Sequence, residues 1–405
     1  MNLVLFTHPD FLGSQSQSRL ARSLLEAYRS RGHQVQLRQP RDDWRRRFRD
    51  TRFAKWAGYV DQYLVFPGAL RAAVARDPAD TLYVFCDQAL GPWMPLVAQR
   101  PHVVHGLDLM ALRSALGLVP ENPTGWTGRI YQRYIRRGFR QARHFISISE
   151  QTRQDLHRYG GVQAETSVVI PLGLNHPYQP LDAAAAQSRL AAGGLQPPTD
   201  GFLLHVGGGQ WYKNTEGVIE IYRQLVLLRQ AGGKPVPQLW MVSPQPSGRV
   251  QGLIDGLPGA AQVRFMPGID SHLLEALYAT TDALLFPSLA EGFGWPIAEA
   301  LACGCPVLTT GVAPMTEVGG AHAHYLPRAQ PATGLAVWAE QAAATLQQVL
   351  ERPLAQRQAA AQAGIRWAER YAADRAIDAY LDVYQRVLAA QPSTVPAARS
   401  ESTAN

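Results

Sequence analysis

Two glutamates, Glu291 and Glu299, stand eight residues apart on either side of a glycine-rich loop. Gly292 and Gly294 allow this loop to turn sharply and to approach a ligand closely. Pro296 suits the start of a helix, whose free N–H groups would attract an anion or sugar hydroxyls. The pattern predicts that Glu291 lies in a binding loop and Glu299 in the first turn of the next helix. Glu299 could instead only complement the helix dipole, but that leaves the two-glycine loop unexplained.

Apolar runs flank this loop on both sides. Residues 283–286 predict a buried strand before it, and residues 306–310 predict another strand after the helix ends at Gly304. A strand–loop–helix–strand unit of this kind is a crossover of a parallel sheet. Because ligands of open parallel sheets bind outside the carboxyl ends of the strands, the loop is predicted to lie at a ligand site.

A second glycine-rich turn follows an apolar run in the same half of the chain. Residues 202–206 predict a strand that leads into a glycine turn and a Lys-Asn pair: Gly207, Gly208, Gly209, Lys213 and Asn214. Backbone N–H groups of such a turn can hold a diphosphate, and a lysine ammonium supplies a compact positive charge. The chain has three lysines against 36 arginines, which favours a specific need for lysine at position 213.

These two segments resemble the retaining glycosyltransferases of family 4, which have the GT-B fold. The resemblance rests on the Glu-x7-Glu sequence EGFGWPIAEALACGCPV, seventeen residues long, and on the glycine turn followed by Trp-Tyr-Lys-Asn. It implies that Glu299 binds the ribose hydroxyls of a nucleotide-sugar and that Glu291 binds the transferred sugar. It also implies that Lys213 and the glycine amides neutralise the departing diphosphate.

Two residues of the first half enter the site through this resemblance. His105 begins a His-Gly-x-Asp sequence after an apolar run, where the family places a histidine against the transferred sugar. Without the family context, a histidine in this position is more often structural. Gly13 lies in an N-terminal loop that the family uses beneath the donor phosphates, although the family usually has two glycines there. The implied catalytic set is His105, Lys213 and Glu291.

The donor-binding set that the resemblance implies includes both glycine-rich segments, and Met266 is expected to pass near the base. Its members are Gly13, Gly207, Gly208, Gly209, Lys213, Asn214, Met266, Gly292, Phe293, Gly294, Trp295 and Glu299. Gly208 stands where the family usually has an arginine. The helix start after Trp295, or Arg19 in the first predicted helix, is expected to supply the second positive charge. Glu317 and residues 149–150 are expected to support the cleft.

Strands and helices alternate along both halves of the chain. A chain of 405 residues exceeds what one hydrophobic core usually serves, so two domains are expected. The predicted fold class is α/β and specifically GT-B, with two Rossmann-like doubly wound domains facing across a cleft and a C-terminal helix crossing back to the first. The expected parts are an acceptor-binding domain at 1–175, a linker at 176–200, a nucleotide-sugar-binding domain at 201–370, the crossover helix at 371–389 and a disordered tail at 390–405.

Composition is typical of a soluble globular protein. Hydrophobic residues make up 46% of the chain, and no apolar run approaches the length of a membrane span. The opening sequence MNLVLFTHPD lacks a basic segment and predicts a first strand, so no secretion signal is expected. The three cysteines fit neither a metal site nor a disulfide framework. We therefore expect a cytoplasmic location and no bound metal.

Positive charge gathers in the first half. Residues 1–180 contain 24 Lys and Arg against 14 Asp and Glu, whereas residues 181–405 contain 15 against 18. Residues 128–143 carry arginines at helical spacing opposite aromatic and aliphatic residues, which predicts a basic amphipathic helix. That helix either packs on the sheet with solvated arginines or makes peripheral contact with the anionic inner face of the cytoplasmic membrane. Residues 41–56 lack periodicity and predict a loop with a short helix.

The expected function is retaining transfer of a hexose of mannose or glucose type from a nucleotide-diphosphate sugar, GDP- or UDP-linked, to a saccharide or lipid-linked acceptor. Synthesis of a bacterial surface polysaccharide or glycolipid is the expected setting. No cofactor and no essential metal are expected, and charge on the leaving diphosphate would be stabilised by Lys213. The alternatives are a degenerate protein that binds nucleotide-sugar without transfer, or a GT-B epimerase or phosphorylase. Nucleic acid is not an expected partner, because the arginines come without a recognition motif.

Overall fold

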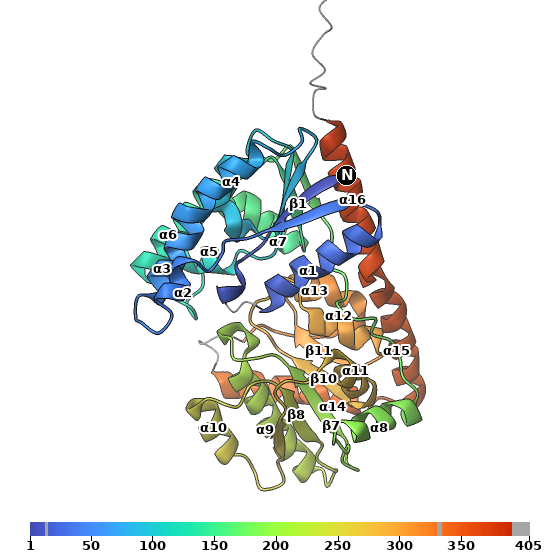
Figure 1. Cartoon of the computed structure of the whole chain (residues 1–405). Coiled ribbons are helices and arrows are strands. Elements are labelled where there is room, and N and C mark those ends of the chain that lie inside the picture. Colours follow the sequence, from blue (N-terminus) through green and yellow to red (C-terminus); the bar gives the residue numbers. More distant parts are fainter. Residues whose placement is uncertain (13–14, 330–333, 391–405) are drawn as a thin grey trace, which may run out of the picture.

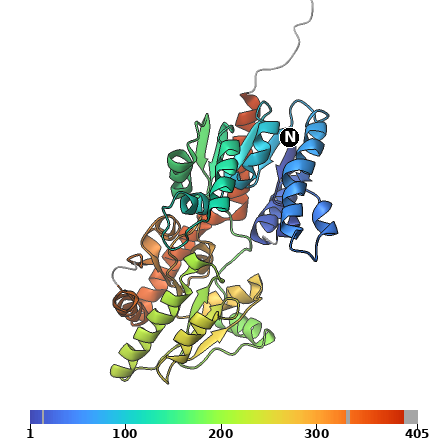
Figure 2. The same cartoon turned by 90° about the vertical axis from the view of Figure 1, so that its left-hand side faces the viewer.

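Two parallel sheets of six strands each organise the chain into two lobes, which lie one above the other in Figure 1. The computed structural model describes residues 1–12, 15–329 and 334–390. The lobes remain distinct when the view is turned by a quarter (Figure 2). Helices cover both faces of each sheet, so the predicted pair of doubly wound domains is confirmed. Gly13 and the predicted tail from residue 391 onward lie outside the described residues.

The first sheet has the strand order β2-β1-β3-β4-β5-β6. Its strands are β1 (Asn2–Phe6), β2 (Gln34–Arg38), β3 (Leu82–Phe85), β4 (His102–Gly106), β5 (His144–Ser147) and β6 (Thr166–Val169). Its main helices are α1 (Gln15–Ser30), α2 (Trp44–Arg47), α3 (Ala54–Val60), α4 (Phe66–Val74), α5 (Met110–Ala115), α6 (Trp126–Phe139) and α7 (Glu150–Asp155). Because successive side chains of a strand face opposite ways, Leu3 and Leu5 pack toward α1, whereas Val4 and Phe6 pack toward α4 and α6.

The second sheet has the strand order β12-β11-β10-β7-β8-β9. Its strands are β7 (Phe202–Val206), β8 (Gln238–Val242), β9 (Val263–Phe265), β10 (Ala283–Phe286), β11 (Val307–Thr310) and β12 (His324–Leu326). Its helices are α8 (Ala183–Ala192), α9 (Thr215–Ala231), α10 (Gly248–Asp255), α11 (Ser271–Thr280), α12 (Trp295–Ala302), α13 (Met315–Gly319), α14 (Leu335–Leu350) and α15 (Leu354–Ala368). Strand β12 was not predicted, because its residues His324, Tyr325 and Leu326 do not form an apolar run.

The last helix, α16 (Ala373–Ala389), packs on the first lobe although the helix before it belongs to the second. In Figure 1 it runs in red beside β1 and α1. Tyr384 and Val387 are buried in the same hydrophobic cluster as Leu3 and Tyr28, and the Tyr384 and Tyr28 hydroxyls lie 3.0 Å apart. The predicted crossing of the C-terminal helix to the first domain is thereby confirmed.

The segment 176–200, predicted as a linker, contains helix α8. Asp182 caps this helix by accepting a hydrogen bond from the N–H of Ala185, 2.7 Å away. Leu190 is fully buried in the core of the second lobe, where α8 packs beside α11. The proline- and glycine-rich composition thus surrounds a short helix that belongs to the second lobe.

Candidate active site

The order of the second sheet reverses between β7 and β10, which are paired neighbours. In a doubly wound sheet, a crevice opens at this point beyond the carboxyl ends of the strands. The loop after β7 carries residues 207–214, and the loop after β10 carries residues 287–294. The fold therefore brings the two glycine-rich segments to the same place, although some eighty residues separate them in the chain.

An ion pair joins the two loops. The Nζ atom of Lys213 donates a hydrogen bond to Oε1 of Glu291 at 2.8 Å, and the two side chains are only 13% and 8% exposed. The same Nζ lies 4.7 Å from the centre of the Phe286 ring, where the ring face also attracts a cation. The lysine charge is therefore fixed in position and poorly solvated before any ligand arrives.

The glycine turn after β7 is tightly packed at its first two positions, and most tightly at the second. A Cβ atom on Gly207 would lie 3.1 Å from Cδ of Lys213, and one on Gly208 would lie 2.8 Å from Cδ of Pro244. Gly209 has a φ of 69°, which favours glycine. Pro244 thus explains why the arginine usual in the family is absent at position 208: its side chain would start in a space that the proline ring fills.

Asn214 ties the glycine turn to the neighbouring loop. Its backbone is left-handed, with φ 54°, a conformation that asparagine tolerates better than most residues. Its side chain donates to the carbonyl of Pro287 at 3.0 Å and accepts from the N–H of Gly217 at 3.2 Å, which caps α9. Asn214 therefore fixes the backbone next to Lys213 by bonds to the neighbouring loop and to α9.

The loop after β10 offers its backbone to the crevice while its large side chains point elsewhere. Phe293 is buried against Tyr371, with ring centres 5.5 Å apart. The indole N–H of Trp295 donates to the carbonyl of Gly173 at 3.2 Å. Gly294, with φ 105°, is the residue that precedes helix α12. Of the predicted donor-binding residues here, Phe293 and Trp295 therefore anchor the loop by their side chains.

Gly292 lies where the second lobe packs closely against the first. A Cβ atom there would lie 2.8 Å from the carbonyl oxygen of Leu107 and 3.0 Å from Cβ of Asp108, both in the first lobe. The hydroxyl of Ser149, also in the first lobe, donates to the Gly292 carbonyl at 3.0 Å. Glycine at this position is required by the approach of the opposite lobe.

Glu299 lies in the second turn of α12, as its fifth residue, so its predicted place in the first turn is wrong. The helix begins at Trp295, one residue before Pro296, so Glu299 is its fifth residue. At this position the Glu299 side chain is buried in the interior of the second lobe. Its side chain accepts a hydrogen bond from the hydroxyl of Tyr278 at 2.9 Å. Burial raises the pKa of Glu299 to about 7, against the opposing effects of Tyr278 and Lys213. Met266 is likewise buried, in the same hydrophobic core as Tyr278.

His105 faces away from the crevice, so its predicted contact with the transferred sugar is wrong for this structure. The imidazole is 1% exposed and its Nε2 atom lies 2.7 Å from the hydroxyl of Tyr384 on α16. Tyr380 packs edge-on against the same ring. Burial lowers the pKa of His105 to about 4, which keeps it neutral. The reason is strand alternation: His105 is still inside β4, on the face that the C-terminal helix covers.

Asp108 takes the place beside the crevice that the sequence assigned to His105. It lies just beyond β4, against Gly292, and its carboxylate accepts from the N–H of Met110 at 3.0 Å. Loss of solvation raises the pKa of Asp108 to about 6, and the carboxylates of Asp87 and Glu291 add to this effect. Sequence reasoning noted this residue only as the end of a motif. The usable signal was its position directly after a buried strand.

The first sheet also reverses its order, between β1 and β3. His8, from the loop after β1, and Asp87, from the loop after β3, meet there with Nε2 and Oδ2 3.0 Å apart. Their side chains are 14% and 4% exposed. Asp87 also accepts from the N–H of Ala89 at 2.8 Å. Sequence reasoning missed this pair, because neither residue belongs to a recognisable motif.

Two polar contacts hold the lobes together near the crevice. Glu317, from α13 of the second lobe, accepts hydrogen bonds from the N–H groups of Glu150 and Gln151 at 2.6 and 2.9 Å. It thereby caps α7 of the first lobe, in keeping with its predicted supporting role. Arg328 of the second lobe donates to Glu121 of the first at 2.7 Å. Both contacts therefore join the two lobes beside the crevice.

Two adjoining cavities open between these contacts. The first, about 620 Å³, is lined from both lobes and includes Glu291, Gln151 and Arg328. The second, about 790 Å³, runs along the second lobe past Gly209 and Asn214. Both cavities touch Trp211, so together they form one hollow of a size suited to a nucleotide and a sugar. Two doubly wound lobes around such a hollow define the class of two-domain proteins that bind a ligand between their lobes.

The chain belongs to the glycosyltransferases of family 4. Residues 17–173 match the family described as Glycosyl transferase 4-like domain, and residues 189–367 match the one described as Glycosyl transferases group 1. The first matched region ends shortly after β6, and the second begins within α8. Each of the two sheets therefore lies mainly in the region matched by a different one of these two families.

Curated relatives are similar over part of their length. The chain is 25% identical to O-antigen chain mannosyltransferase B of Escherichia coli over 201 residues, which are 47% of this chain and 49% of the relative. It is 27% identical over 263 residues to D-inositol 3-phosphate glycosyltransferase of Jonesia denitrificans, covering 62% and 60%. The chain therefore spans about half of the first relative and three fifths of the second.

Solved structures share the whole architecture. Sucrose-phosphate synthase from Thermosynechococcus elongatus superposes with a TM-score of 0.72 at 19% identity, over 96% of this chain and 100% of that one. WaaG, a glycosyltransferase involved in lipopolysaccharide biosynthesis, superposes with a TM-score of 0.66 at 17% identity, over 94% and 99%. These likenesses confirm the GT-B fold.

Proposed function

We propose that the protein transfers a hexose from a nucleoside-diphosphate sugar held by the second lobe to an acceptor held by the first. The observation that carries this proposal is the Lys213–Glu291 pair beneath the glycine turn, at the crevice of the second sheet. Departure of a nucleoside diphosphate develops negative charge, which a fixed and poorly solvated ammonium stabilises well. The glycine amides would share this charge, and no bound metal is needed for it.

Glu291 has a natural task in this scheme. In the free protein it neutralises Lys213; when the diphosphate arrives, the lysine gains a second anionic partner and Glu291 can turn to sugar hydroxyls. Glu299 would bind the ribose hydroxyls through a carboxylate that Tyr278 holds in place. Since Pro244 excludes an arginine at position 208, the start of α12 is the nearest candidate for further positive charge. Arg19 is exposed on α1, across the crevice.

The acceptor hydroxyl would meet the His8–Asp87 pair. Both residues lie at the crevice of the first sheet, and Asp108 lies near enough to Asp87 and to Glu291 of the other lobe for both carboxylates to raise its pKa. Asp87 fixes the imidazole, so that His8 can hold a hydroxyl in line with the sugar. The relatives named as mannosyltransferases favour mannose as the transferred hexose and a saccharide acceptor. Retention of configuration follows from the family resemblance.

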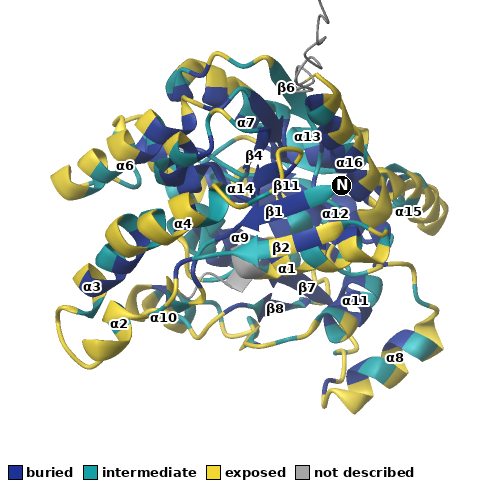
Figure 3. Ribbon diagram, turned by 45° about the horizontal axis from the view of Figure 1, so that its top comes forward, coloured by how far each residue is buried: buried dark blue, intermediate teal, exposed yellow. Residues whose placement is uncertain are grey.

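An exposed aromatic and basic surface supports an acceptor at a membrane. It covers α2, α3 and α6, which Figure 3 shows largely exposed on one side of the first lobe. Nine exposed large side chains define this surface: Trp44, Phe48, Phe53, Trp56, Leu64, Val65, Trp126, Ile130 and Tyr134. Tryptophan, arginine and aliphatic side chains together suit the interface of an anionic bilayer. In the part of the chain that the structure describes, no helix has the length and apolarity needed to cross a membrane.

The basic helix itself plays a smaller part than its sequence suggests. Arg136 and Arg140 donate to the carbonyls of Gly160 and Gly161, both at 3.0 Å, and so brace α6 against the first lobe. Tyr134, expected on the packed face, is 45% exposed. The membrane contact that we propose therefore rests on the aromatic residues of three helices. Vesicles of anionic lipid should bind the protein, and a Trp56→Ala, Trp126→Ala variant should bind them less than a Leu227→Ala control, whose exposed leucine lies on α9.

Incubation with candidate donors and isolated lipid-linked or oligosaccharide acceptors tests the proposed activity directly. A thermal-shift screen first identifies which nucleoside-diphosphate sugar binds, and mass spectrometry then detects acceptors heavier by one hexose. The anomeric configuration of the product, read by NMR, decides between retention and inversion. Donor binding without transfer to any acceptor would support the degenerate nucleotide-sugar-binding protein instead.

A further inference from the structure

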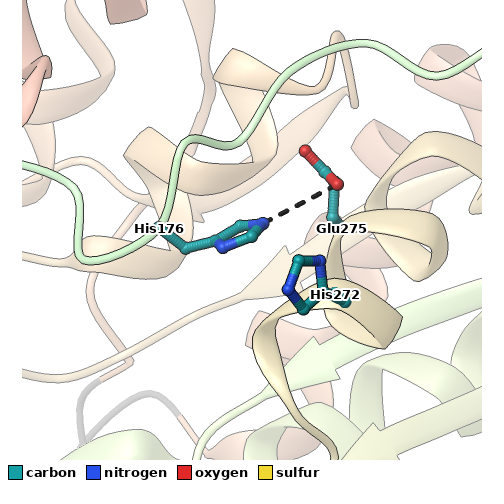
Figure 4. A group of neighbouring side chains, drawn as sticks. All are labelled: His176, His272 and Glu275. Carbon is teal, nitrogen blue, oxygen red and sulfur yellow. Dashed lines mark ion pairs between the residues drawn. The ribbon is translucent and has the colours of Figure 1, made fainter.

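Two histidines and a glutamate converge outside the crevice, on the connection between the lobes. His176 lies in the segment that follows β6, and His272 and Glu275 lie in the first turns of α11 (Figure 4). One ligand atom from each of the three lies within 4.8 Å of the other two. His272 and Glu275 are three residues apart, so the helix places them on one face. The glycosyl transfer proposed above does not use this group.

The contacts of the group leave ligand atoms available. The Nε2 atom of His176 is shut off from solvent and has no hydrogen-bond partner, and it lies 3.7 Å from Oε2 of Glu275. Burying a ring nitrogen without a partner is unfavourable, so this atom is suited to accept a ligand. Glu275 is 2% exposed and is held through Oε1, which accepts from the N–H of Gln179 at 3.0 Å. The imidazole of His272 is exposed and gives access from solvent.

We propose that His176, His272 and Glu275 bind a divalent transition-metal ion, with zinc the best match. Two imidazoles and a carboxylate are a donor set that zinc prefers, with a fourth position left for water. Ligand atoms sit about 2.0–2.1 Å from zinc, so the three must draw slightly closer together than they lie here. The exposed His272 side chain can make that adjustment.

Arg189 competes with the metal for Glu275. Its guanidinium donates to Oε2 of Glu275, the oxygen nearest His176, and its own side chain is 37% exposed. A metal ion at this oxygen displaces the guanidinium toward solvent. The Arg189 guanidinium therefore occupies the place of the metal charge beside Glu275. Removal of Arg189 should tighten metal binding, whereas removal of a histidine should weaken it.

The position of the site gives the metal a structural consequence. It would tie the segment after the first lobe, through His176, to helix α11 of the second lobe. The same helix carries Tyr278, one turn after Glu275, and Tyr278 donates to the buried carboxylate of Glu299. A bound metal would thus stiffen the connection between the lobes close to the residue proposed to hold the donor ribose.

Titration of the metal-free full-length protein with Zn²⁺ by calorimetry tests this proposal, with Co²⁺ absorption as a report on the coordination sphere. One ion should bind, and His272→Ala should weaken binding about tenfold or more, while Arg189→Gln should strengthen it. His157→Ala is the matched control, because that histidine is also exposed and lies on the first lobe. Zinc should raise the Tm of the unmodified protein, and at the same zinc concentration it should raise the Tm of His272→Ala less.

Three results would overturn the proposal: no saturable binding of zinc by the unmodified protein, equal affinity in His272→Ala, or weaker binding in Arg189→Gln. His272 is exposed, so its removal should not disturb folding, and circular dichroism verifies this. The titration measures metal binding itself. Its result is therefore independent of whether the protein transfers a hexose.

Discussion

The two lobes are built alike, yet their crevices carry opposite chemistry. Each sheet reverses its strand order once, and at each reversal two loops meet. In the second lobe the loops are glycine turns around the Lys213–Glu291 pair, which suits an anion that must be held closely by backbone. In the first lobe the loops hold the His8–Asp87 pair with Asp108 nearby, which suits a neutral hydroxyl. The same topology thus serves a charged donor on one side and an uncharged acceptor group on the other.

The largest effect is expected from Lys213→Ala. This change removes the charge that faces the leaving diphosphate and leaves Glu291 buried without its partner, so kcat should fall about 10²–10³-fold. Steady-state kinetics with saturating acceptor measures it. Lys234→Ala is the matched control, because Lys234 pairs with Glu351 at the surface. Unchanged kcat in Lys213→Ala would contradict the proposal that the crevice of the second lobe stabilises the leaving diphosphate through Lys213.

A smaller and more selective effect is expected from His8→Ala. If the first crevice holds the acceptor hydroxyl, KM for the acceptor should rise about tenfold, since one hydrogen bond to a positioned group is lost. KM for the donor should stay the same. Kinetics with each substrate varied in turn separates the two. A rise in donor KM alone would show that the two crevices do not divide their substrates as we propose.

Glu299 gives the second lobe a pH dependence that Glu299→Gln should remove. The pKa of Glu299 is about 7 in the folded protein, against 4.5 for a solvated glutamate such as that of the unfolded chain, so folding favours the protonated form. Its contribution to stability is full below pH about 4.5 and is lost as pH rises through about 7, by on the order of 3 kcal/mol at most. Urea unfolding across this range measures the loss, which should be absent in Glu299→Gln.

Donor binding should respond to the same titration in the opposite direction. The deprotonated carboxylate accepts hydroxyl groups, so donor affinity should rise as pH increases through about 7. Calorimetric titration with the donor at several pH values checks this expectation. A donor affinity independent of pH in the unmodified protein would contradict the ribose role of Glu299.

The smallest effect on catalysis is expected from His105→Phe. The imidazole touches Tyr384 and Tyr380 of α16 and lies away from both crevices, so kcat should be unchanged. The free energy of unfolding should fall by about 1–3 kcal/mol, because the buried hydroxyl of Tyr384 loses a partner. Denaturation and kinetics on the same preparation test both statements. A large loss of kcat at unchanged stability would restore His105 to the site.

Much of the donor side was predictable from sequence because local rules determine it. Glycines at 207–209 and at 292 and 294 indicate backbone that must turn sharply or approach a neighbour, and the apolar runs before them indicate buried strands. These are properties of short segments. Both loops were therefore recognised, and their meeting at one crevice followed from the general rule for parallel sheets.

The acceptor side was less predictable, because there the outcome depends on which face of a strand each side chain occupies. His105 and Asp108 are three residues apart, yet only Asp108 reaches the crevice, since β4 ends at Gly106. The pairing of His8 with Asp87 needs two strands to become neighbours. Glu299 is displaced from the first turn into the second because α12 begins one residue earlier than predicted, and a proline alone indicates a helix start only to within a residue.

The sequence by itself determined the fold class, the two glycine-rich loops and the family resemblance, because each is written in local periodicity and in residues that few others can replace. Only the tertiary structure decided that Lys213 pairs with Glu291, that Pro244 excludes an arginine at position 208 and that His176 meets His272 and Glu275. These facts join residues that are tens of positions apart. Their distances are set by how helices and sheets pack, and no local pattern encodes them.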